Sequence, residues 1–246
     1  MKTNRICVWS GPRNVSTALM YSFAQRADTR VIDEPLYSAY LSGPGAHRAQ
    51  AHPGAEEVIS SLPSDPDVAI REGMLQETGC PVYFIKNMAQ HWGCFPEELL
   101  PEFANVILFR HPALVARSFD KVVEAPVAAD LGFPQQLEIL NGLRRMGLPV
   151  VSAESERIRN APEQELRRLC EGVGIDFDPS MLSWDPGGRP EDGIWAKHWY
   201  ANVHASTGFS PDHAGVPDLE DLPERIRPVV EECLPIYEEL RRLAGA

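Results

Sequence analysis

Residues 5–27 constrain the fold more than any other part of the chain. Residues 5–9 form a short apolar run that predicts a strand, residues 10–17 (SGPRNVST) predict a tight loop, and residues 18–24 have the pattern of a helix. A helix start presents unpaired backbone N–H groups and the positive end of a dipole. This order of elements therefore predicts a site for an anion.

The side chains of the loop support that interpretation. Gly11 and Pro12 turn the chain, and Ser16 and Thr17 carry oxygen atoms suited to the start of a helix. Arg13 supplies a planar fork that can bind a phosphate or sulfate with two hydrogen bonds. The Gly-Lys-Ser/Thr ending of the common ATPase and GTPase loop is absent, so this is a phosphate loop of another type. The loop residues that we expect to contact the anion are Gly11, Pro12, Arg13, Asn14, Val15, Ser16 and Thr17.

The rest of the chain alternates between short apolar runs and helical patterns. Further strands are predicted at residues 31–32, 82–86, 105–110 and 149–152, and helices at residues 56–62, 114–123, 135–146 and 162–172. Strands that alternate with helices form a parallel sheet covered on both faces. We therefore expect an α/β fold with three layers, αβα, and a central, mostly parallel sheet of about five strands.

We expect residues 1–246 to form a single domain with a loop-rich segment at residues 178–218. Residues 42–55 contain no pattern for a regular element, and a loop of this length is typical of a lid or a binding loop. A terminal helix is predicted at residues 223–243, with interruptions near Pro228 and Pro235.

Four ionisable residues stand at or just beyond the carboxyl ends of predicted strands. In open α/β sheets ligands bind at this edge. If the strands share one sheet, the side chains of Arg13, Glu34, Lys86 and Arg110 converge beside the phosphate loop.

A second motif at a predicted strand end adds to the prediction of an anion site. Arg110 ends a predicted strand in the sequence Phe-Arg-His-Pro, and Ser118 follows eight residues later, about two turns into the next helix. With the loop at residues 10–17, this motif resembles the two signatures of sulfotransferases that use 3′-phosphoadenosine 5′-phosphosulfate (PAPS). The Pro-Arg-x-x-Ser-Thr loop is similar to that of many bacterial and carbohydrate sulfotransferases. The resemblance spans roughly residues 5–123.

The resemblance implies a fold like that of the phosphate-loop NTPases and a reaction that moves a sulfuryl group from PAPS to a hydroxyl or amine of a small soluble acceptor. It implies that residues 10–17 bind the 5′-phosphosulfate and that Arg110 and Ser118 hold the 3′-phosphate. PAPS would be a co-substrate, and no metal is expected. Acceptor pockets in such folds are made by variable loops, so the acceptor and the oligomeric state stay open.

Two residues compete for the role of general base. Some family members place a catalytic Glu after the second strand, which matches Glu34, and Arg13 would then stabilise the charge on the departing phosphate. Others use a His two residues after a strand-ending Lys. Here Lys86 is followed by Asn87 and Met88, and the nearest histidine is His91. We therefore expect Glu34 to be the base, with His91 as the second candidate and Lys86 as a further catalytic candidate.

A late basic and aromatic segment matches the family only loosely. Lys197 is expected to reach a nucleotide phosphate, with Arg189 as the alternative. The tryptophans of residues 184–199 are expected to belong to the core more than to stack on adenine.

Composition narrows the class of protein. The net charge of −12 argues against general nucleic-acid binding, and five scattered cysteines without a Cys-x-x-Cys pair argue against zinc and disulfides. No signal peptide precedes the first strand, and no apolar run approaches about 18 residues, so a cytoplasmic protein without a membrane segment is expected. Two alternatives remain: a phosphate-loop kinase or hydrolase that uses ATP, and a non-catalytic nucleotide-binding protein.

Overall fold

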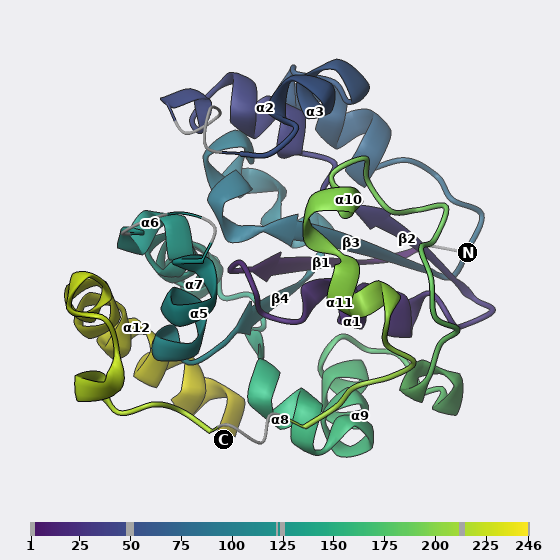
Figure 1. Ribbon diagram of the computed structural model, residues 1–246. Coiled ribbons are helices and arrows are strands. Elements are labelled where there is room, and N and C mark those ends of the chain that lie inside the picture. Colours follow the sequence, from purple (N-terminus) through teal and green to yellow (C-terminus); the bar gives the residue numbers. More distant parts are fainter. Residues whose placement is uncertain (1–2, 48–51, 122, 124–125, 212–214, 246) are drawn as a thin grey trace.

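The computed structural model describes residues 3–47, 52–121, 123, 126–211 and 215–245 (Figure 1). Within these residues the centre of the molecule is a sheet of five strands in the order β2-β3-β1-β4-β5, and each neighbouring pair is parallel. The strands are β1 (Asn4–Ser10), β2 (Thr29–Asp33), β3 (Val82–Met88), β4 (Ala104–Phe109) and β5 (Val151–Glu154). The predicted α/β class and parallel sheet are confirmed.

Helices and tighter turns connect the strands. The α-helices are α1 (Ser16–Phe23), α2 (Tyr37–Ser42), α3 (Ala55–Ser61), α4 (Pro66–Ala69), α5 (Pro112–Phe119), α6 (Ala128–Leu131), α7 (Phe133–Arg145), α8 (Ser155–Asn160), α9 (Pro162–Gly172), α10 (Ala196–Trp199), α11 (Ala201–His204) and α12 (Arg227–Gly245). A π-helical turn, η2 (Ile70–Met74), and the 3₁₀ turns η3 (Ala89–Cys94), η4 (Glu97–Glu102), η5 (Pro179–Leu182), η6 (Leu219–Asp221) and η7 (Glu224–Ile226) complete the elements.

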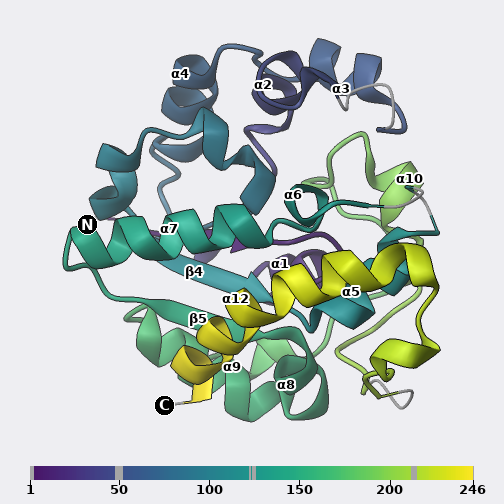
Figure 2. The same cartoon turned by 90° about the vertical axis from the view of Figure 1, so that its left-hand side faces the viewer.

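The alternation of side chains along β1 separates two cores. Cys7 and Trp9 belong to the core that α7 and α12 cover, whereas Ile6 and Val8 belong to the core that α1 and α9 cover. Figures 1 and 2 show α5, α7 and α12 on one face of the sheet, with α1, α8 and α9 on the other. This arrangement is the expected αβα sandwich. It directs the carboxyl ends of β1, β2, β3 and β4 toward the same edge.

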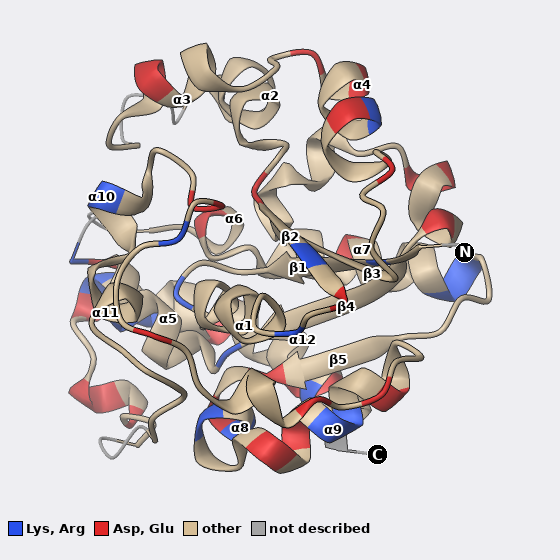
Figure 3. Cartoon of the chain, turned by 90° about the vertical axis from the view of Figure 1, so that its right-hand side faces the viewer, with Lys and Arg blue, Asp and Glu red and all other residues tan. Residues whose placement is uncertain are grey.

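Charged side chains lie mainly on the outer helices. Figure 3 shows acidic and basic residues interspersed over α8 and α9, while the ribbon of the central strands is largely uncharged. The few charged side chains that are buried among the strands are therefore exceptional, because an ion in the interior needs partners to compensate its lost hydration.

Two expectations about the chain were wrong. The last helix is not interrupted at Pro235: α12 runs from Arg227 to Gly245 with this proline inside it, after the separate turn η7. An internal proline costs about 3 kcal/mol, and the burial of Cys233, Tyr237 and Leu240 against the sheet offsets that cost. The expected loop at residues 42–55 is also shorter at both ends. Helix α2 reaches Ser42 and α3 begins at Ala55, while residues 48–51 lie outside the described residues.

Candidate active site

The loop between β1 and α1 has an unusual backbone. Arg13 and Val15 both have positive φ angles, 63° and 54°, and Glu34 after β2 has a φ of 46°. Non-glycine residues rarely adopt this left-handed region, and for a β-branched residue such as Val15 it is strained, at about 1–3 kcal/mol. Such strain persists only where the surroundings enforce it, and it is concentrated at functional sites. Left-handed residues in alternation also turn successive N–H groups toward one point, which creates an anion-binding concavity.

Close packing holds this loop in place. A Cβ atom on Gly11 would lie 2.7 Å from the Leu131 carbonyl oxygen, so only glycine fits there. The Asn14 amide nitrogen donates to the Leu108 carbonyl at 3.2 Å, and the Ser155 hydroxyl donates to the Asn14 carbonyl at 2.9 Å. Helix α1 begins directly afterwards at Ser16, and the valine that precedes it has no side-chain acceptor to cap the first turn. We call the loop and the start of α1 the cradle, because a helix start presents backbone N–H groups that can bind an anion.

Arg13, Ser118 and Arg110 lie together on one side of the cradle. Arg13 Nε donates to the Ser118 hydroxyl at 3.0 Å, and Arg110 donates through one terminal nitrogen to the Arg13 carbonyl at 3.1 Å. The Arg110 Nε also donates to Glu156 at 2.7 Å. Burial, followed by the charge of Arg110, lowers the pKa of Arg13. Two guanidinium groups held in such proximity favour an anion between them.

A buried ion cluster lies on the other side. Lys86 is 1% exposed, and its ammonium group donates to Glu34 Oε1 at 2.5 Å, to Asp33 Oδ1 at 2.8 Å and to the Tyr200 hydroxyl at 2.8 Å. The Tyr200 hydroxyl donates in turn to Asp33 Oδ2 at 2.7 Å and accepts from the Trp195 indole at 3.0 Å. We call Asp33, Glu34, Lys86 and Tyr200 the lysine cluster. Its hydrogen bonds engage all three hydrogens of the ammonium group.

The lysine cluster sets the acidity of its members. Burial raises the pKa of Glu34 to about 7; Lys86 opposes this shift and the charge of Asp33 adds to it. Burial alone would lower the pKa of Lys86, but Asp33 and Glu34 hold that pKa well above its usual value. Lys86 is therefore charged, while Glu34 titrates near neutral pH. A carboxyl with this pKa suits general base catalysis.

His91 completes this side. Its Nε2 lies 3.8 Å from Glu34 Oε2, and its ring stacks on Tyr37 with a centroid distance of 5.5 Å. Burial, followed by the charge of Lys86, lowers the pKa of His91 well below its usual value, so the imidazole is neutral. The sequence left Glu34 and His91 as rival bases, and the structure places them side by side.

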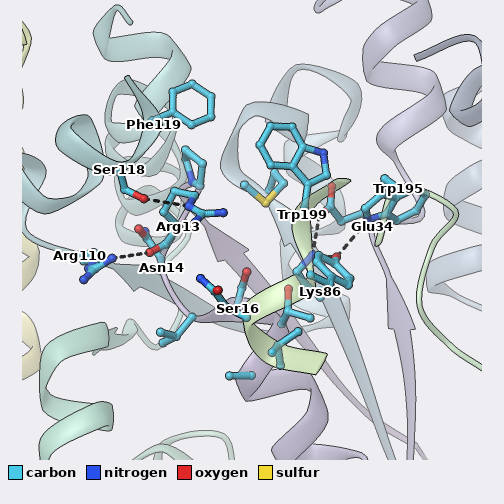
Figure 4. A pocket seen from close by; sticks show the side chains of 18 of the residues that line it. Arg13, Asn14, Ser16, Glu34, Lys86, Arg110, Ser118, Phe119, Trp195 and Trp199 are labelled. Atoms are coloured by element: carbon cyan, nitrogen blue, oxygen red, sulfur yellow. Dashed lines mark hydrogen bonds and ion pairs between the residues drawn. The ribbon is translucent and has the colours of Figure 1, made fainter. Parts of the chain in front are cut away.

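A cavity of about 420 Å³ joins the two sides (Figure 4). Arg13, Arg110 and Ser118 lie at one end in this view, and Glu34, Lys86, Trp195 and Trp199 lie at the other. The predicted site residues that line the cavity are Pro12, Arg13, Asn14, Val15, Ser16, Thr17, Glu34, Lys86, His91, Arg110 and Ser118. Gly11 does not line the cavity, and its position in the loop allows the close approach of Leu131.

One assignment needs correction. Lys197 does not line the cavity; its ammonium group lies on the surface and pairs with Glu57 of α3. The short helix α10 directs Trp199 and Tyr200 to the cavity instead, and both Trp195 and Trp199 line it. Lys86, the further catalytic candidate, lines the cavity, and the hydrogens of its ammonium group are all directed to Asp33, Glu34 and Tyr200.

Sequence reasoning missed Asp33 and Tyr200. Asp33 directly precedes Glu34 at the end of β2, and the rule that ligands gather at strand ends applies to it equally. Tyr200 is 167 residues away from Asp33 in a loop-rich segment, where no periodic pattern indicates its position.

Comparisons with known proteins agree with this arrangement. A family model described as a sulfotransferase domain matches residues 4–243. Two Arabidopsis thaliana proteins, named branched-chain-amino-acid aminotransferase-like protein 2 and protein 1, are each 37% identical over 96% and 95% of the chain. The chain spans 41% of the length of each of these relatives.

Several solved structures named as sulfotransferases have a similar fold. The sulfotransferase domain from the curacin biosynthetic pathway superposes with a TM-score of 0.58 at 19% identity, with 98% of both chains covered. The sulfotransferase domain of the Synechococcus PCC 7002 olefin synthase gives a TM-score of 0.57 at 17% identity, with 98% of this chain and 96% of that chain covered. A sulfotransferase from Alicyclobacillus acidocaldarius gives 0.55 at 14% identity, with 100% and 97% covered.

Two features are absent from the described residues. No helix there has the length and apolar character that a bilayer span requires. No group of three or more His, Cys, Asp and Glu side chains there is arranged to hold a metal ion.

Proposed function

Because this chain belongs to the sulfotransferase domain family, we propose that it transfers the sulfuryl group of PAPS to a hydroxyl or amine of a small acceptor. The observation that carries the proposal is the single cavity that joins an anion cradle, two arginines and a carboxyl group with a pKa of about 7. Each of these parts corresponds to one requirement of sulfuryl transfer. The cradle binds the reacting phosphosulfate, the arginines stabilise the negative charge of the phosphates, and the carboxyl group takes the proton of the acceptor.

The donor would lie across the start of α1. The N–H groups of residues 13–17 would hold the 5′-phosphosulfate, and Arg110 with Ser118 would hold the 3′-phosphate. Arg13 lies between these groups, because its side chain contacts Ser118 while its carbonyl accepts from Arg110. The Arg13 guanidinium can therefore bind either phosphate of the nucleotide. As negative charge grows on the leaving 5′-phosphate, binding of the guanidinium to that phosphate would become more favourable.

The acceptor would react at the opposite end of the cavity. Its hydroxyl or amine attacks the sulfur, the bond from sulfur to the 5′-phosphate oxygen breaks, and the proton of the acceptor passes to Glu34. The products are the sulfated acceptor and 3′-phosphoadenosine 5′-phosphate (PAP). Lys86 would act by orienting the Glu34 carboxylate through the 2.5 Å hydrogen bond, rather than by contact with the donor.

Thermal stabilisation by nucleotides tests the donor assignment. PAP is expected to raise the melting temperature more than AMP or ATP with magnesium, because only PAP presents two separated phosphate groups to the cradle and to Arg110. A larger shift with ATP and magnesium would favour the kinase or hydrolase alternative. PAP binding without any sulfated product, across a broad acceptor panel, would favour a non-catalytic nucleotide-binding protein.

A further inference from the structure

The positions of Glu34 and His91 restrict the chemistry of the acceptor. Glu34 Oε2 and His91 Nε2 are 3.8 Å apart, which is too long for a direct hydrogen bond. An oxygen atom about 2.8 Å from both atoms would lie beside the line that joins them. Both residues line the cavity, so an acceptor group can occupy that position.

The identity of the His91 tautomer follows from its surroundings. The imidazole is neutral, and its Nε2 faces a carboxylate oxygen, where an N–H is attracted and a lone pair is repelled. The other ring nitrogen, Nδ1, is buried and has no hydrogen-bond partner among the described residues. Nε2 therefore carries the proton and acts as a donor toward the reacting group.

A hydroxyl satisfies this pair of residues, whereas an amine does not. A hydroxyl oxygen can donate its proton to Glu34, accept from His91 with one lone pair and attack sulfur with the other. A neutral amine has a single lone pair, which the attack on sulfur requires, so it cannot accept from His91 during transfer. The amine would leave the His91 N–H without a partner in a buried site.

The charge of the lysine cluster excludes acidic acceptors. A carboxylate or sulfate on the acceptor would approach Asp33 and Glu34, while the hydrogens of Lys86 are already engaged by these two residues and Tyr200. Like charges in such proximity are strongly disfavoured. The acceptor body beside Glu34 is therefore uncharged.

Aromatic rings form the walls of this end of the cavity. Tyr37 stacks on His91, Trp195 packs edge-on against Tyr37 at 5.1 Å, and Tyr40 lies 5.3 Å from His91 between ring centroids. Trp199 lies beside Trp195 at the same end (Figure 4). Ring faces and edges of this kind bind a flat apolar body by stacking and edge contacts.

We propose that the acceptor is an uncharged aromatic alcohol or phenol whose hydroxyl contacts both Glu34 and His91, so that the protein sulfates oxygen and discriminates against nitrogen. This inference rests on the proposed function, and it assigns His91 a catalytic contact to the acceptor oxygen alongside Glu34 as the base.

Three matched acceptors test the inference with PAPS as donor. 4-Methylphenol is expected to react with a kcat/KM at least about tenfold above that of 4-methylaniline, which differs only in the reacting atom. It is also expected to exceed 4-hydroxybenzoate, which adds a charge to the same ring, by at least about tenfold. PAP release and the mass of the sulfated product give the rates.

His91→Phe shows whether the discrimination comes from the imidazole. This variant keeps a ring against Tyr37 but removes the N–H, so the ratio of phenol to aniline turnover is expected to fall toward one. An equal loss for both acceptors would assign His91 a structural role and overturn the inference. Glu57→Gln, a change at an exposed carboxylate outside the cavity, is the control that keeps the ratio unchanged.

Thermal stabilisation by PAP distinguishes failure of the proposed function from failure of the acceptor inference. If PAP does not stabilise the protein and no acceptor reacts, the proposed function fails. In two other outcomes PAP stabilises the protein, but 4-methylaniline or 4-hydroxybenzoate reacts with a kcat/KM equal to or above that of 4-methylphenol, or none of the three acceptors reacts. Either result overturns only the acceptor inference.

Discussion

Lys86 Nζ lies 2.5 Å from Glu34 Oε1, so the proposed general base is held by a buried cation rather than by water. Asp33 accepts from the same ammonium group at 2.8 Å. Two carboxylates thus share one cation. Burial raises the pKa of Glu34 to about 7, Lys86 opposes this shift only in part, and the charge of Asp33 adds to it. This sharing makes Glu34 more basic than a carboxylate with a lysine of its own.

Glu34→Gln separates catalysis from binding. The amide keeps the shape of the side chain but cannot accept a proton, so kcat is expected to fall by about a hundredfold or more while the affinity for PAP is nearly unchanged. Calorimetric titration with PAP and steady-state kinetics measure the two effects. Glu57→Gln is the control. A Glu34→Gln protein with full turnover would exclude Glu34 as the base.

The pH profile of kcat/KM reports the pKa of Glu34. The base must be ionised to act, so activity is expected to fall as the pH drops through about 7. Asp33→Asn is expected to move this limb to lower pH, because the charge of Asp33 raises the pKa of Glu34 and because Lys86 would then compensate Glu34 alone. Movement of the limb to higher pH would contradict the shared-cation interpretation. The Glu57→Gln profile should match that of the unmodified protein.

Arg110→Ala tests the second phosphate site. Loss of a charge-assisted hydrogen bond of about 1.5–3 kcal/mol is expected to weaken PAP binding about tenfold or more, and AMP binding much less. Glu156→Gln removes the charge that pairs with Arg110 but keeps the guanidinium, so it controls for structural damage. Lys197→Ala removes a cation outside the cavity and is expected to leave PAP affinity unchanged. Tight PAP binding by Arg110→Ala, or weak binding by Lys197→Ala, would reverse these assignments.

Tyr200→Phe removes one hydroxyl from the lysine cluster. Lys86 and Asp33 would each lose a buried partner, so the free energy of unfolding is expected to fall by about 1–3 kcal/mol and turnover is expected to fall with it. Tyr237→Phe is a matched control, because this buried hydroxyl donates to Glu154 at 2.6 Å and does not line the cavity. Urea unfolding should show a comparable loss for both variants. Turnover should fall only for Tyr200→Phe, and an equal effect of both variants on turnover would assign Tyr200 a structural role alone.

The strands that position the candidate site, and the sheet edge at which it lies, could largely be predicted from the sequence. The apolar run before Gly11 and the one before Arg110 indicated β1 and β4, and the rule for parallel sheets placed Glu34 and Lys86 at the same edge. These inferences depend on short-range patterns and on one topological rule. The roles of the individual residues in catalysis stay predictions.

Long-range partners could not be predicted in the same way. The sequence neighbours of Lys86 give no sign that Asp33 and Tyr200 bury it. Lys197 was assigned to the nucleotide because it lies in a basic and aromatic segment, yet its partner is Glu57 on a distant helix. The left-handed backbone of Val15 also escaped prediction, since β-branched residues disfavour that conformation.

The hydrogen bond from the Tyr200 hydroxyl to Asp33 joins residues that are 167 positions apart in the sequence. The two partners are therefore synthesised at different times. During synthesis the strands that carry Asp33, Glu34 and Lys86 emerge well before the segment that carries Tyr200 and Trp195. A ribosome-bound chain that ends before residue 195 already contains the phosphate loop, Arg110 and Ser118, but its lysine lacks the phenol and the indole that enclose it. On the proposed function, the residues assigned to the donor nucleotide are therefore synthesised before the segment that encloses Lys86.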